Sequence, residues 1–560
     1  MRNLSIIKTI LMAGIYVLLT GNSAFAQQNL ATWPVANLPV VKSPSFKADT
    51  FNIVKYGAIA DGVTLNTRSI NNAISECNSK GGGVVVIPAG LWITGPIELK
   101  SNVNLHLESN AILSFTRDFD QYKLVETNWE GLAAVRNQSP ISGTNLENIA
   151  ITGTGIVDGN GDAWRMVKKD KLTESQWKKL VASGGVVGAD QRTWYPSAKS
   201  VKGSQLKGAG VIAEGKTIKD YEDIKDFLRP NMVVLTRCKK ILLEGVTFQN
   251  SPAWNLHPLM CEDLTLRNVN VKNPWYAQNG DGVDVESCKN VLIENSVFDV
   301  GDDGICIKSG RNEQGRKRGM PTENLLVRNC VVYHAHGGFV IGSEMSGGAR
   351  NLFVTDCTFI GTDIGLRFKT TRGRGGLVEN VYVKNISMKD IPGDAVLFDM
   401  YYEAKDPLPL AGEKREAPKV ARVPVTEETP QFREFYVSNI VCDGAERGVF
   451  VRGLPEMNIN SIHLQDMVLQ AQKGIEMEEA SNISFKNVHL ITESTNPVVK
   501  ISGSRQIVFD GINYNKGADL LFSVNGDQNE NIVVQNTDIT QAKAKVEFNF
   551  GASKKALKFK

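Results

Sequence analysis

Four short polar clusters contain the residues of this sequence that are best suited to chemistry. In chain order they are Asn279-Gly280-Asp281, Gly301-Asp302-Asp303-Gly304, His336-Gly337-Gly338 and Arg367-Phe368-Lys369. Neighbouring carboxylic acids can divide the work of hydrolysis, because one protonates a leaving oxygen while another activates water. Crowding of like charges raises the pKa of one acid and keeps its proton available near neutral pH. The arginine and the lysine suit a substrate carboxylate.

Each cluster has an ordinary structural interpretation when it is taken alone. Asn-Gly-Asp-Gly and Gly-Asp-Asp-Gly are common turn sequences, and a single histidine is more often structural than catalytic. An Arg-x-Lys pair is more often part of a solvated surface. The clusters therefore predict chemistry only if the fold brings them together.

A repeated phrase predicts a fold that would do so. The phrase is a polar residue, then alternating apolar residues, then Asn, Asp or Gly. Copies begin at Lys240, Glu262, Asn290, Asn324, Leu352, Val381, Phe435, Ile462, Ile483, Ile507 and Ile532. The alternation is that of half-buried strands, and no long amphipathic helix intervenes. Short strands that recur mostly every 21 to 34 residues, with one gap of about 54, predict an all-β parallel β-helix, a solenoid.

The position of each cluster within its copy can be counted from the start of the strand. Asp302 follows Val291 by the same interval as His336 follows Leu325. The interval from Leu264 to Asp281 equals the interval from Leu352 to Lys369, and both are longer than the interval from Val291 to Asp302. Adjacent coils lie about 4.8 Å apart, the distance between paired strands. We therefore expect the clusters to form one polar patch.

The chain is expected to form one catalytic domain behind a signal peptide. Residues 1–26 have the basic start, the apolar run and the Ala24-Phe25-Ala26 cleavage site of an export signal. Residues 27–45 are predicted to be a linker, and 46–560 the β-helix. A short helix with Ile70, Ala73, Ile74 and Cys77 at helical spacing should cap its N-terminal end.

Two stretches interrupt the repeat, at about 164–228 and 403–430. The first contains a predicted helix near Glu174 to Val181. Long insertions in a repeat array become loops on one face, often the binding face, and a purely structural role is equally open here.

Charge and cysteine content narrow the function. The formal net charge is +3, which favours neither nucleic acid nor an acidic membrane as a partner. Six of the eight cysteines, from Cys238 to Cys357, recur at about the repeat interval, so we favour stacked buried thiols over disulfides. No CxxC or His/Cys pairing indicates a metal site.

Taken in order, the clusters resemble the pattern of the polygalacturonases, family 28 of the glycoside hydrolases: Asn-x-Asp, Asp-Asp, Gly-His-Gly and Arg-x-Lys. The resemblance extends over most of the chain from about residue 50 and includes Ser251-Pro252-Ala253-Trp254. It implies a right-handed β-helix and hydrolysis of galacturonic-acid linkages in pectin with inversion, without metal or organic cofactor. A pectic oligo- or polysaccharide would be the partner of an exported monomer, periplasmic or extracellular, without a membrane anchor.

The resemblance also implies roles for individual residues. Asp302 would be the general acid, Asp281 with Asp303 would activate water, and His336 would orient the acids. Residues expected to bind the substrate are Asn279, Arg367 and Lys369, together with Lys308 and His257 on neighbouring coils. Two positions depart from the family pattern: Gly280 stands where Thr is frequent, and Ala335 replaces the first Gly of the histidine motif.

Other functions remain open at this point. A pectate lyase shares the solenoid, but His336 and the Arg-x-Lys pair favour hydrolysis. A carbohydrate-binding solenoid is disfavoured, since three acids in one patch would repel an anionic glycan. Among hydrolases we favour exo action, because the two insertions can close one end of a cleft, and rhamnogalacturonan is the main alternative substrate.

Overall fold

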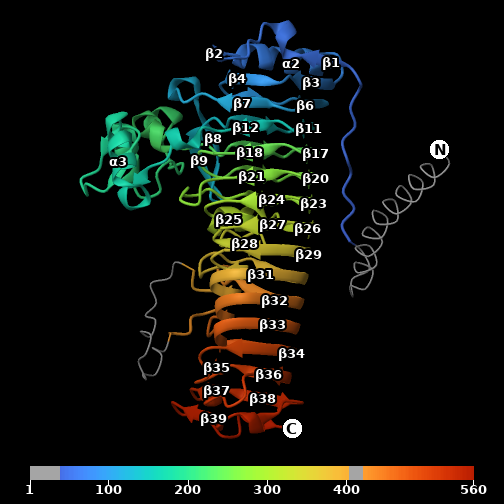
Figure 1. Ribbon diagram of the computed structural model, residues 1–560, viewed down its shortest axis with the longest axis vertical. Coiled ribbons are helices and arrows are strands. Elements are labelled where there is room, and N and C mark those ends of the chain that lie inside the picture. Colours follow the sequence, from blue (N-terminus) through green and yellow to red (C-terminus); the bar gives the residue numbers. More distant parts are fainter. Residues whose placement is uncertain (1–37, 403–419) are drawn as a thin grey trace, which may run out of the picture. The chain divides into compact units, whose positions relative to one another are not determined.

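The computed structural model describes residues 38–402 and 420–560. The predicted signal peptide, most of the predicted linker and residues 403–419 of the second insertion lie outside them. Val41–Lys560 forms one compact unit, and this unit is a parallel β-helix (Figure 1). Among the described residues, 35 strands belong to one continuous sheet in which strands of successive coils pair in parallel. The predicted all-β solenoid is confirmed.

Each coil at the middle of the stack contains three strands. One strand of each coil belongs to what we call the site stack: β16 (Val233–Thr236), β19 (Leu256–Leu259), β22 (Val283–Glu286), β25 (Asp303–Lys308), β28 (Gly337–Ile341) and β30 (Leu366–Lys369). The second side of the coil is formed by β17 (Lys239–Glu244), β20 (Glu262–Arg267), β23 (Lys289–Glu294), β26 (Thr322–Arg328) and β29 (Ala349–Ile360). The third side is formed by β18 (Thr247–Gln249), β21 (Asn270–Lys272), β24 (Val297–Asp299) and β27 (Val331–Tyr333).

The alternation of side chains explains why the coils stack. Val283, Ile305 and Phe339 are paired in register on successive coils, and all three are fully buried in the interior. Neighbouring residues of the same strands point outward, because successive side chains of a strand face opposite sides. Apolar residues therefore hold the stack together, and the polar clusters are left on its outer surface.

The C-terminal coils are built from longer strands that follow the coil around its corners. They are β31 (Leu377–Asp399), β32 (Gln431–Arg452), β33 (Ile459–Glu478) and β34 (Ala480–Thr492), followed by β35 (Val499–Ser502), β36 (Arg505–Asn513), β37 (Leu520–Asn525), β38 (Glu530–Gln535), β39 (Ala544–Asn549) and β40 (Leu557–Phe559). The predicted copies from Leu352 to Ile532 are paired residue to residue in one continuous row.

A helix caps the first coils, as predicted. The first strands are β1 (Thr50–Asn52), β2 (Asp61–Leu65), β3 (Gly83–Ile87), β4 (Gly90–Thr94), β5 (Ile97–Glu98), β6 (Val103–Leu107), β7 (Ala111–Phe115), β10 (Ile141–Thr144), β11 (Glu147–Gly153) and β12 (Ile156–Asp158). Helix α2 (Thr67–Ser79) lies at their end of the stack (Figure 1), and Ile70, Ala73, Ile74 and Cys77 are all fully buried.

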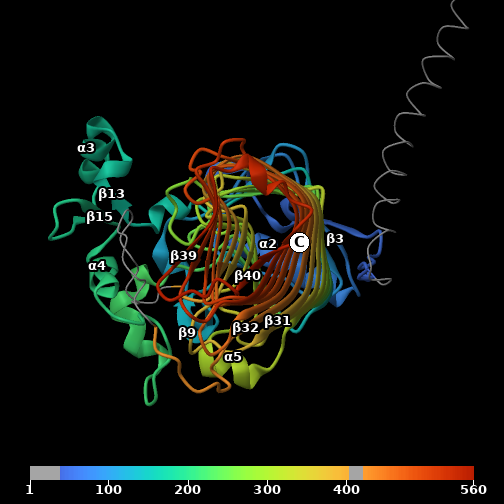
Figure 2. The ribbon, with the colours of Figure 1, turned by 90° about the horizontal axis from the view of Figure 1, so that it is seen from below.

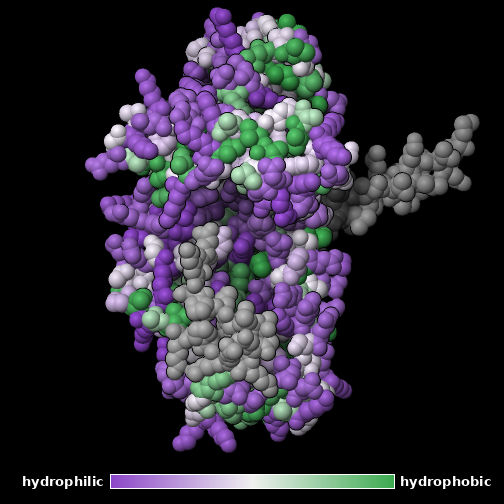
Figure 3. Space-filling view, turned by 90° about the vertical axis from the view of Figure 1, so that its left-hand side faces the viewer, coloured by the Kyte–Doolittle hydropathy of each residue, from purple (hydrophilic) through white to green (hydrophobic). Residues whose placement is uncertain are grey.

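Two excursions leave the coils on one side of the solenoid (Figure 2). The first is the antiparallel hairpin of β8 (Leu124–Trp129) and β9 (Leu132–Asn137). The second is the predicted insertion, which contains β13 (Val167–Lys168), α3 (Glu174–Ala182), β14 (Val186–Val187), β15 (Thr193–Tyr195), α4 (Ala198–Ser204) and the 3-10 segment η5 (Ile218–Phe227). The helix predicted near Glu174 is α3, and Thr173 caps its first turn together with Gln176. The face on this side is largely hydrophilic (Figure 3).

The eight cysteines are buried and free, as we expected in favouring thiols over disulfides. They do not form a single stack, however. Cys238, Cys261 and Cys288 follow one another at one corner of the coil, whereas Cys330 and Cys357 follow one another at another corner. Cys306 lies within the site stack itself.

Candidate active site

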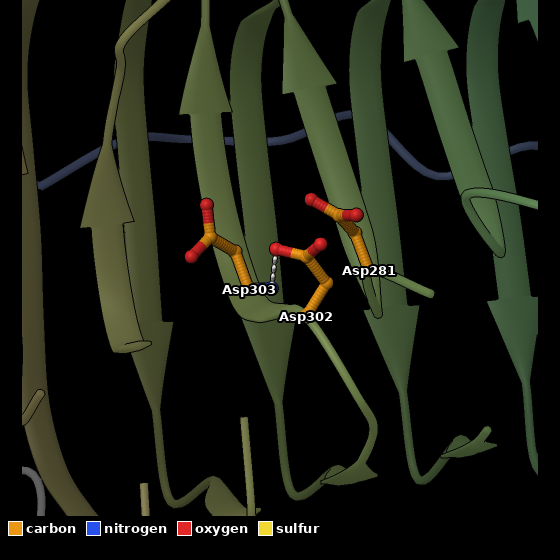
Figure 4. Close-up of side chains that lie close together, drawn as sticks. All are labelled: Asp281, Asp302 and Asp303. Atoms are coloured by element: carbon orange, nitrogen blue, oxygen red, sulfur yellow. Dashed lines mark hydrogen bonds between the residues drawn. The ribbon is translucent and has the colours of Figure 1, made fainter. Parts of the chain in front are cut away.

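Three aspartates converge on the outer surface of the site stack (Figure 4). One carboxylate oxygen from each of Asp281, Asp302 and Asp303 lies within 4.8 Å of the others. Val283 pairs with Ile305, so the strand register places Asp281 and Asp303 at matching positions on adjacent coils. Asp302 precedes Asp303 in the turn, and its Oδ1 accepts a hydrogen bond of 3.0 Å from the amide of Asp303. Asp302 is the most exposed of the three.

Two cations hold Asp303 in its ionised form. Lys369 Nζ donates to Asp303 Oδ2 at 2.7 Å, and Arg367 Nη1 donates to Asp303 Oδ1 at 3.1 Å. Burial opposes ionisation, but the charges of Lys369 and Arg367 outweigh it and hold the pKa of Asp303 below its usual range. Asp303 is therefore a negatively charged group with both oxygens engaged.

Asp281 has the opposite environment. Its pKa is raised well above the usual value by burial, and the neighbouring Asp284, Asp302 and Asp303 raise it further. One of its oxygens, Oδ1, is buried without a hydrogen-bond partner among the described residues. The three aspartates therefore retain a proton near neutral pH, since they cannot all be ionised at this separation.

His336 lies directly against the exposed acid. Its Nδ1 is 3.1 Å from Asp302 Oδ1, and its Nε2 is 3.7 Å from Asp363 Oδ2. The hydrogen bond to Asp302 raises the pKa of His336, although burial acts against it. The register confirms the predicted pairing, because Asp303 is paired with Gly337 and the amide of His336 donates to the carbonyl of Asp302.

Asp281 and Lys369, which lie at equal distances from the starts of their strands in the sequence, do not occupy the same register position in the sheet. Val283 lies farther along the chain from Lys272 than the matching Ile305 lies from Asp299. The turn after β21 is thus longer than the turn after β24, which shifts the count for Asp281. Lys369 lies further along its strand than the position that matches Asp281, and its long side chain reaches back to Asp303.

Two residues that we expected to touch the substrate are buried at outward positions of the site stack. Lys308 is 4% exposed, and its Nζ is 3.0 Å from Glu344 Oε2 and 3.6 Å from Asp284 Oδ1. His257 is 1% exposed, and its Nε2 is 2.8 Å from Glu286 Oε2. These contacts correct the expected role: they favour support of neighbouring acidic groups over direct contact with a sugar, since both polar ends are already engaged.

A further buried cation was not anticipated from the sequence. Arg229 Nη2 donates to Asn279 Oδ1 at 2.8 Å, and its Nη1 donates to the carbonyls of Pro252 and Gln278. Burial lowers the pKa of Arg229 to about 10, and the group stays charged at neutral pH. Arg229 thus fixes the turn that carries Asn279. No motif surrounds it in the sequence, so only the fold reveals its position.

The structure explains both departures from the family pattern. The amide of Gly280 donates to the carbonyl of Ala277 at 3.0 Å, and a Cβ at position 280 would lie 2.7 Å from that carbonyl oxygen. The lengthened turn therefore requires glycine at this position. Ala335 is fully buried and does not take a positive φ, so its methyl group is accommodated without backbone strain.

The β8–β9 hairpin crosses the site stack next to the acids. Trp129, near its tip, stacks on Trp254 of the preceding coil with ring centroids 5.9 Å apart. Beyond the stack, Glu130 Oε2 binds Arg311 Nη1 at 3.1 Å. At its base, the hairpin packs against Ile224 and the adjoining part of the first insertion. The hairpin and the insertion thus pack together on the N-terminal side of the acids.

Comparison with known proteins agrees with this geometry. The family model described as "Glycosyl hydrolases family 28" matches residues 185–427, which include all four clusters, and "Rhamnogalacturonase A/epimerase, pectate lyase-like" matches residues 50–185. Over residues 185–427 the chain is similar to glycosyl hydrolase family 28. This similarity spans the part of the chain that carries the three aspartates, His336, Arg367 and Lys369.

Individual relatives and one solved structure are similar to larger parts of the chain. A "Probable polygalacturonase" of Vitis vinifera is 30% identical over 355 residues, which span 62% of this chain and 62% of that protein. An "Exo-poly-alpha-D-galacturonosidase" of Dickeya chrysanthemi is 28% identical over 451 residues, 78% of this chain and 70% of that protein. The crystal structure of an exopolygalacturonase from Thermotoga maritima superposes with a TM-score of 0.63 at 29% identity and covers 80% of this chain and 93% of the other. No helix in the described part of the chain has the length and apolar character needed to span a membrane.

Proposed function

We propose that the protein hydrolyses α-galacturonosidic linkages in pectin, in homogalacturonan or its oligosaccharides, and that it acts from a chain end with inversion. The observation that carries the proposal is the division of charge among the three acids. Asp303 is held ionised by Lys369 and Arg367, while the pKa of Asp281 is raised. Asp303 is thus available as a base, and the three acids within 4.8 Å of one another retain a proton, so the cluster holds both the base and the proton that glycoside hydrolysis requires.

Asp302 is the group placed to protonate the leaving oxygen. It is the most exposed of the three acids, and His336 holds its Oδ1 at 3.1 Å. Asp303 accepts a proton from the attacking water as its oxygen bonds to the sugar carbon, and Asp303 releases this proton to solvent after the product leaves. The proton lost by Asp302 returns from solvent after the product leaves, with His336 as the adjacent exchangeable group.

Inversion is favoured by the engagement of Asp303 rather than by distance. Carboxylates of inverting enzymes are commonly about 6.5–9.5 Å apart, farther than those found here. A nucleophile must bring one oxygen onto the sugar carbon, however, and Arg367 and Lys369 hold both oxygens of Asp303 in place, whereas a base needs only a remaining lone pair to accept a proton. Asp281 is a poor nucleophile because its raised pKa keeps it protonated. Water activated by Asp303 is therefore the best attacking group.

Arg367 and Lys369 also offer a site for the carboxylate of the sugar. Arg367 Nε is buried without a hydrogen-bond partner among the described residues, and Lys369 Nζ has Asp303 as its ion-pair partner. A uronate next to Asp303 would share these two cations. This arrangement supports an acidic sugar as the substrate over a neutral one.

Exo action is supported by the position of the β8–β9 hairpin on the N-terminal side of the acids. The hairpin, with Trp129 against Trp254, lies across the coil immediately before that of Asp281. A polysaccharide that passed through would have to displace this packing, whereas a chain end would fit against it. The relatives named for exo action are consistent with this proposal.

The test is the product profile from long homogalacturonan. Short products of uniform length from the earliest time point are expected, and proton NMR should show the β-anomer first when an α-linkage is cleaved with inversion. A ladder of mixed oligomers would contradict exo action, and an α-anomer appearing first would contradict inversion.

Rhamnogalacturonan remains the second candidate substrate. The model that matches residues 50–185 carries a rhamnogalacturonase description. That segment precedes all four clusters, so it bears on the first coils rather than on the acids. Activity on a rhamnogalacturonan backbone, with none on homogalacturonan, would favour this candidate.

We also propose that the protein is exported and acts as a monomer in the periplasm or outside the cell. The proposal rests on the basic, apolar and Ala24-Phe25-Ala26 segments of the N-terminus. N-terminal sequencing of the mature protein tests it, with cleavage after Ala26 as the expected result.

A further inference from the structure

A pocket of about 450 Å³ opens beside His336, at the edge of the site stack. One wall comes from the first insertion and includes Lys168 and Lys171; the other comes from the turns of four successive coils and includes Trp275. Every wall residue of these turns precedes the strand of its coil, so the pocket lies beside the strands rather than over them. Its volume is in the range of small-molecule sites.

An aromatic platform forms part of the pocket. Trp275 is 59% exposed, and Tyr276 lies edge-on to it with ring centroids 5.9 Å apart. Burial of the apolar surface of an indole ring is favourable in free energy, and an exposed Trp275 does not gain this stabilisation. The apolar C–H face of a sugar ring can restore that burial by stacking on the indole. An exposed aromatic group beside a glycosidase site therefore points to a sugar as its ligand.

Positive charge surrounds this platform. Lys171 Nζ lies 4.6 Å from the centroid of the Trp275 ring, and Lys168 lies on the same wall. Neither lysine forms an ion pair with another residue in the part of the chain that the structure describes. Their ammonium groups can therefore turn toward an anionic group of a sugar stacked on Trp275.

The platform is fixed relative to the acids. Trp275 lies in the lengthened turn after β21, in which the amide of Ala277 donates to the carbonyl of Pro274 at 2.8 Å. A Cβ at Gly301 would lie 2.8 Å from the carbonyl oxygen of Trp275, so glycine there lets the two turns pack closely. Gly301 is adjacent to Asp302. The same turn requires Gly280, and thus the departure from the family pattern accompanies the platform.

We propose that this pocket is a subsite for a second sugar ring, with Trp275 as its stacking platform and Lys171 as the partner of an anionic group. The inference rests on the proposed function and adds a specificity determinant to it. Two sources share this chemistry: the next galacturonate of a linear chain, and a side branch of a substituted pectic fragment. The position of the pocket beside the strands favours the branch.

Steady-state kinetics of Trp275→Ala and Lys171→Ala test the proposal. The substrates are linear trigalacturonate and a branched pectic oligosaccharide of similar length. Trp275→Phe keeps an aromatic face, and Lys178→Ala removes an exposed lysine of the same insertion outside the pocket, so both serve as matched controls. Trp275 is exposed, and its replacement should leave the melting temperature unchanged.

For the branched substrate we expect Trp275→Ala to raise KM by about tenfold, which corresponds to about 1.4 kcal/mol of binding, with kcat unchanged. Lys171→Ala should raise it less, and both controls should resemble the wild type. An equal rise for the linear trimer would assign the pocket to the main chain. Unchanged KM for both substrates in an active enzyme would overturn the inference alone, whereas a wild type inactive on both would overturn the proposed function and the inference with it.

Discussion

Asp281 and Asp303 occupy matching positions on adjacent coils, and their surroundings shift their pKa values in opposite directions. Of these two acids, Lys369 and Arg367 contact only Asp303, while Asp281 is buried among other carboxyl groups. Two aspartates one coil apart thus differ in protonation: Asp303 favours the ionised form and Asp281 favours the protonated form. The solenoid makes this possible because it brings side chains together at the strand spacing while their contacts differ from coil to coil.

Replacement of the exposed acid tests its assigned role. Asp302→Asn keeps the size of the side chain but cannot protonate a leaving oxygen, so kcat should fall by about 10²- to 10⁴-fold, the range for loss of a general acid. Binding of an oligogalacturonate, measured by calorimetry, should stay within a few-fold of the wild type. Full activity in Asp302→Asn would show that another group supplies the proton.

The dependence of activity on Lys369 tests the ionisation of Asp303. Lys369→Met removes the closer of the two cations, so the pKa of Asp303 should rise by about one to three units, the usual effect of a nearby opposite charge. The acid limb of kcat/KM should move to higher pH by a similar amount. Arg367→Lys, which keeps a charge, should move it less. An unmoved acid limb would mean that Asp303 is not the base.

The same ion pair should also appear in the pH dependence of stability. The folded-state pKa of Asp303 is depressed, so its contribution to stability is present above the unfolded value of about 3.9 and is lost as pH falls through the folded value. Urea unfolding of the wild type and of Asp303→Asn should therefore converge as the solution is acidified below about pH 4. A difference that persists unchanged at low pH would contradict this account.

The geometry of the lengthened turn predicts that restoring the residue of the family pattern at position 280 will destabilise the protein. Gly280→Thr would restore the residue that is frequent there, but the new Cβ would lie 2.7 Å from the carbonyl oxygen of Ala277. The expected cost is about 1–3 kcal/mol of stability, as for other overpacked sites, together with reduced activity because Asp281 follows directly. Ala335→Gly restores the other departure and should cost only about 1 kcal/mol. Equal effects of the two substitutions on the urea midpoint would contradict the explanation of Gly280.

Removal of the ion pair at the tip of the β8–β9 hairpin tests whether this hairpin determines exo action. The double variant Glu130→Gln/Arg311→Ala removes the ion pair that anchors the tip and leaves Trp129 in place. We expect the share of longer oligomers among early products to rise, while the melting temperature changes by only a few degrees. A second variant in which β8 and β9 are shortened should show a larger rise. An unchanged product profile in both variants would place the determinant of exo action elsewhere.

Much of this site was predictable from the sequence because the repeat and the clusters are both local patterns. Counting from the start of the strand correctly paired Asp302 with His336, since their two coils have turns of equal length. The same method was misleading for Asp281 and Lys369, because a longer turn precedes β22. Periodicity thus locates residues only where the turns between strands keep their length.

Other features could not be predicted because they depend on contacts between distant segments. Arg229 has no motif around it, and the hairpin at 124–137 reaches Arg311 only through the fold. Lys308 and His257 lie at outward positions of their strands, but contacts with neighbouring acids and the surrounding chain bury them. Burial of an outward side chain on a solenoid depends on which long turns cover it. The alternation of apolar and polar residues in the sequence does not predict this.

The most direct test of the central claim is incubation of the purified mature protein with polygalacturonic acid in the presence of EDTA, followed by chromatography of the products. Hydrolysis by the aspartates, with Asp303 as the base, predicts saturated galacturonate products that accumulate despite the chelator and do not absorb in the ultraviolet as unsaturated sugars do. Unsaturated products whose formation stops with EDTA would contradict the account and indicate elimination by a lyase.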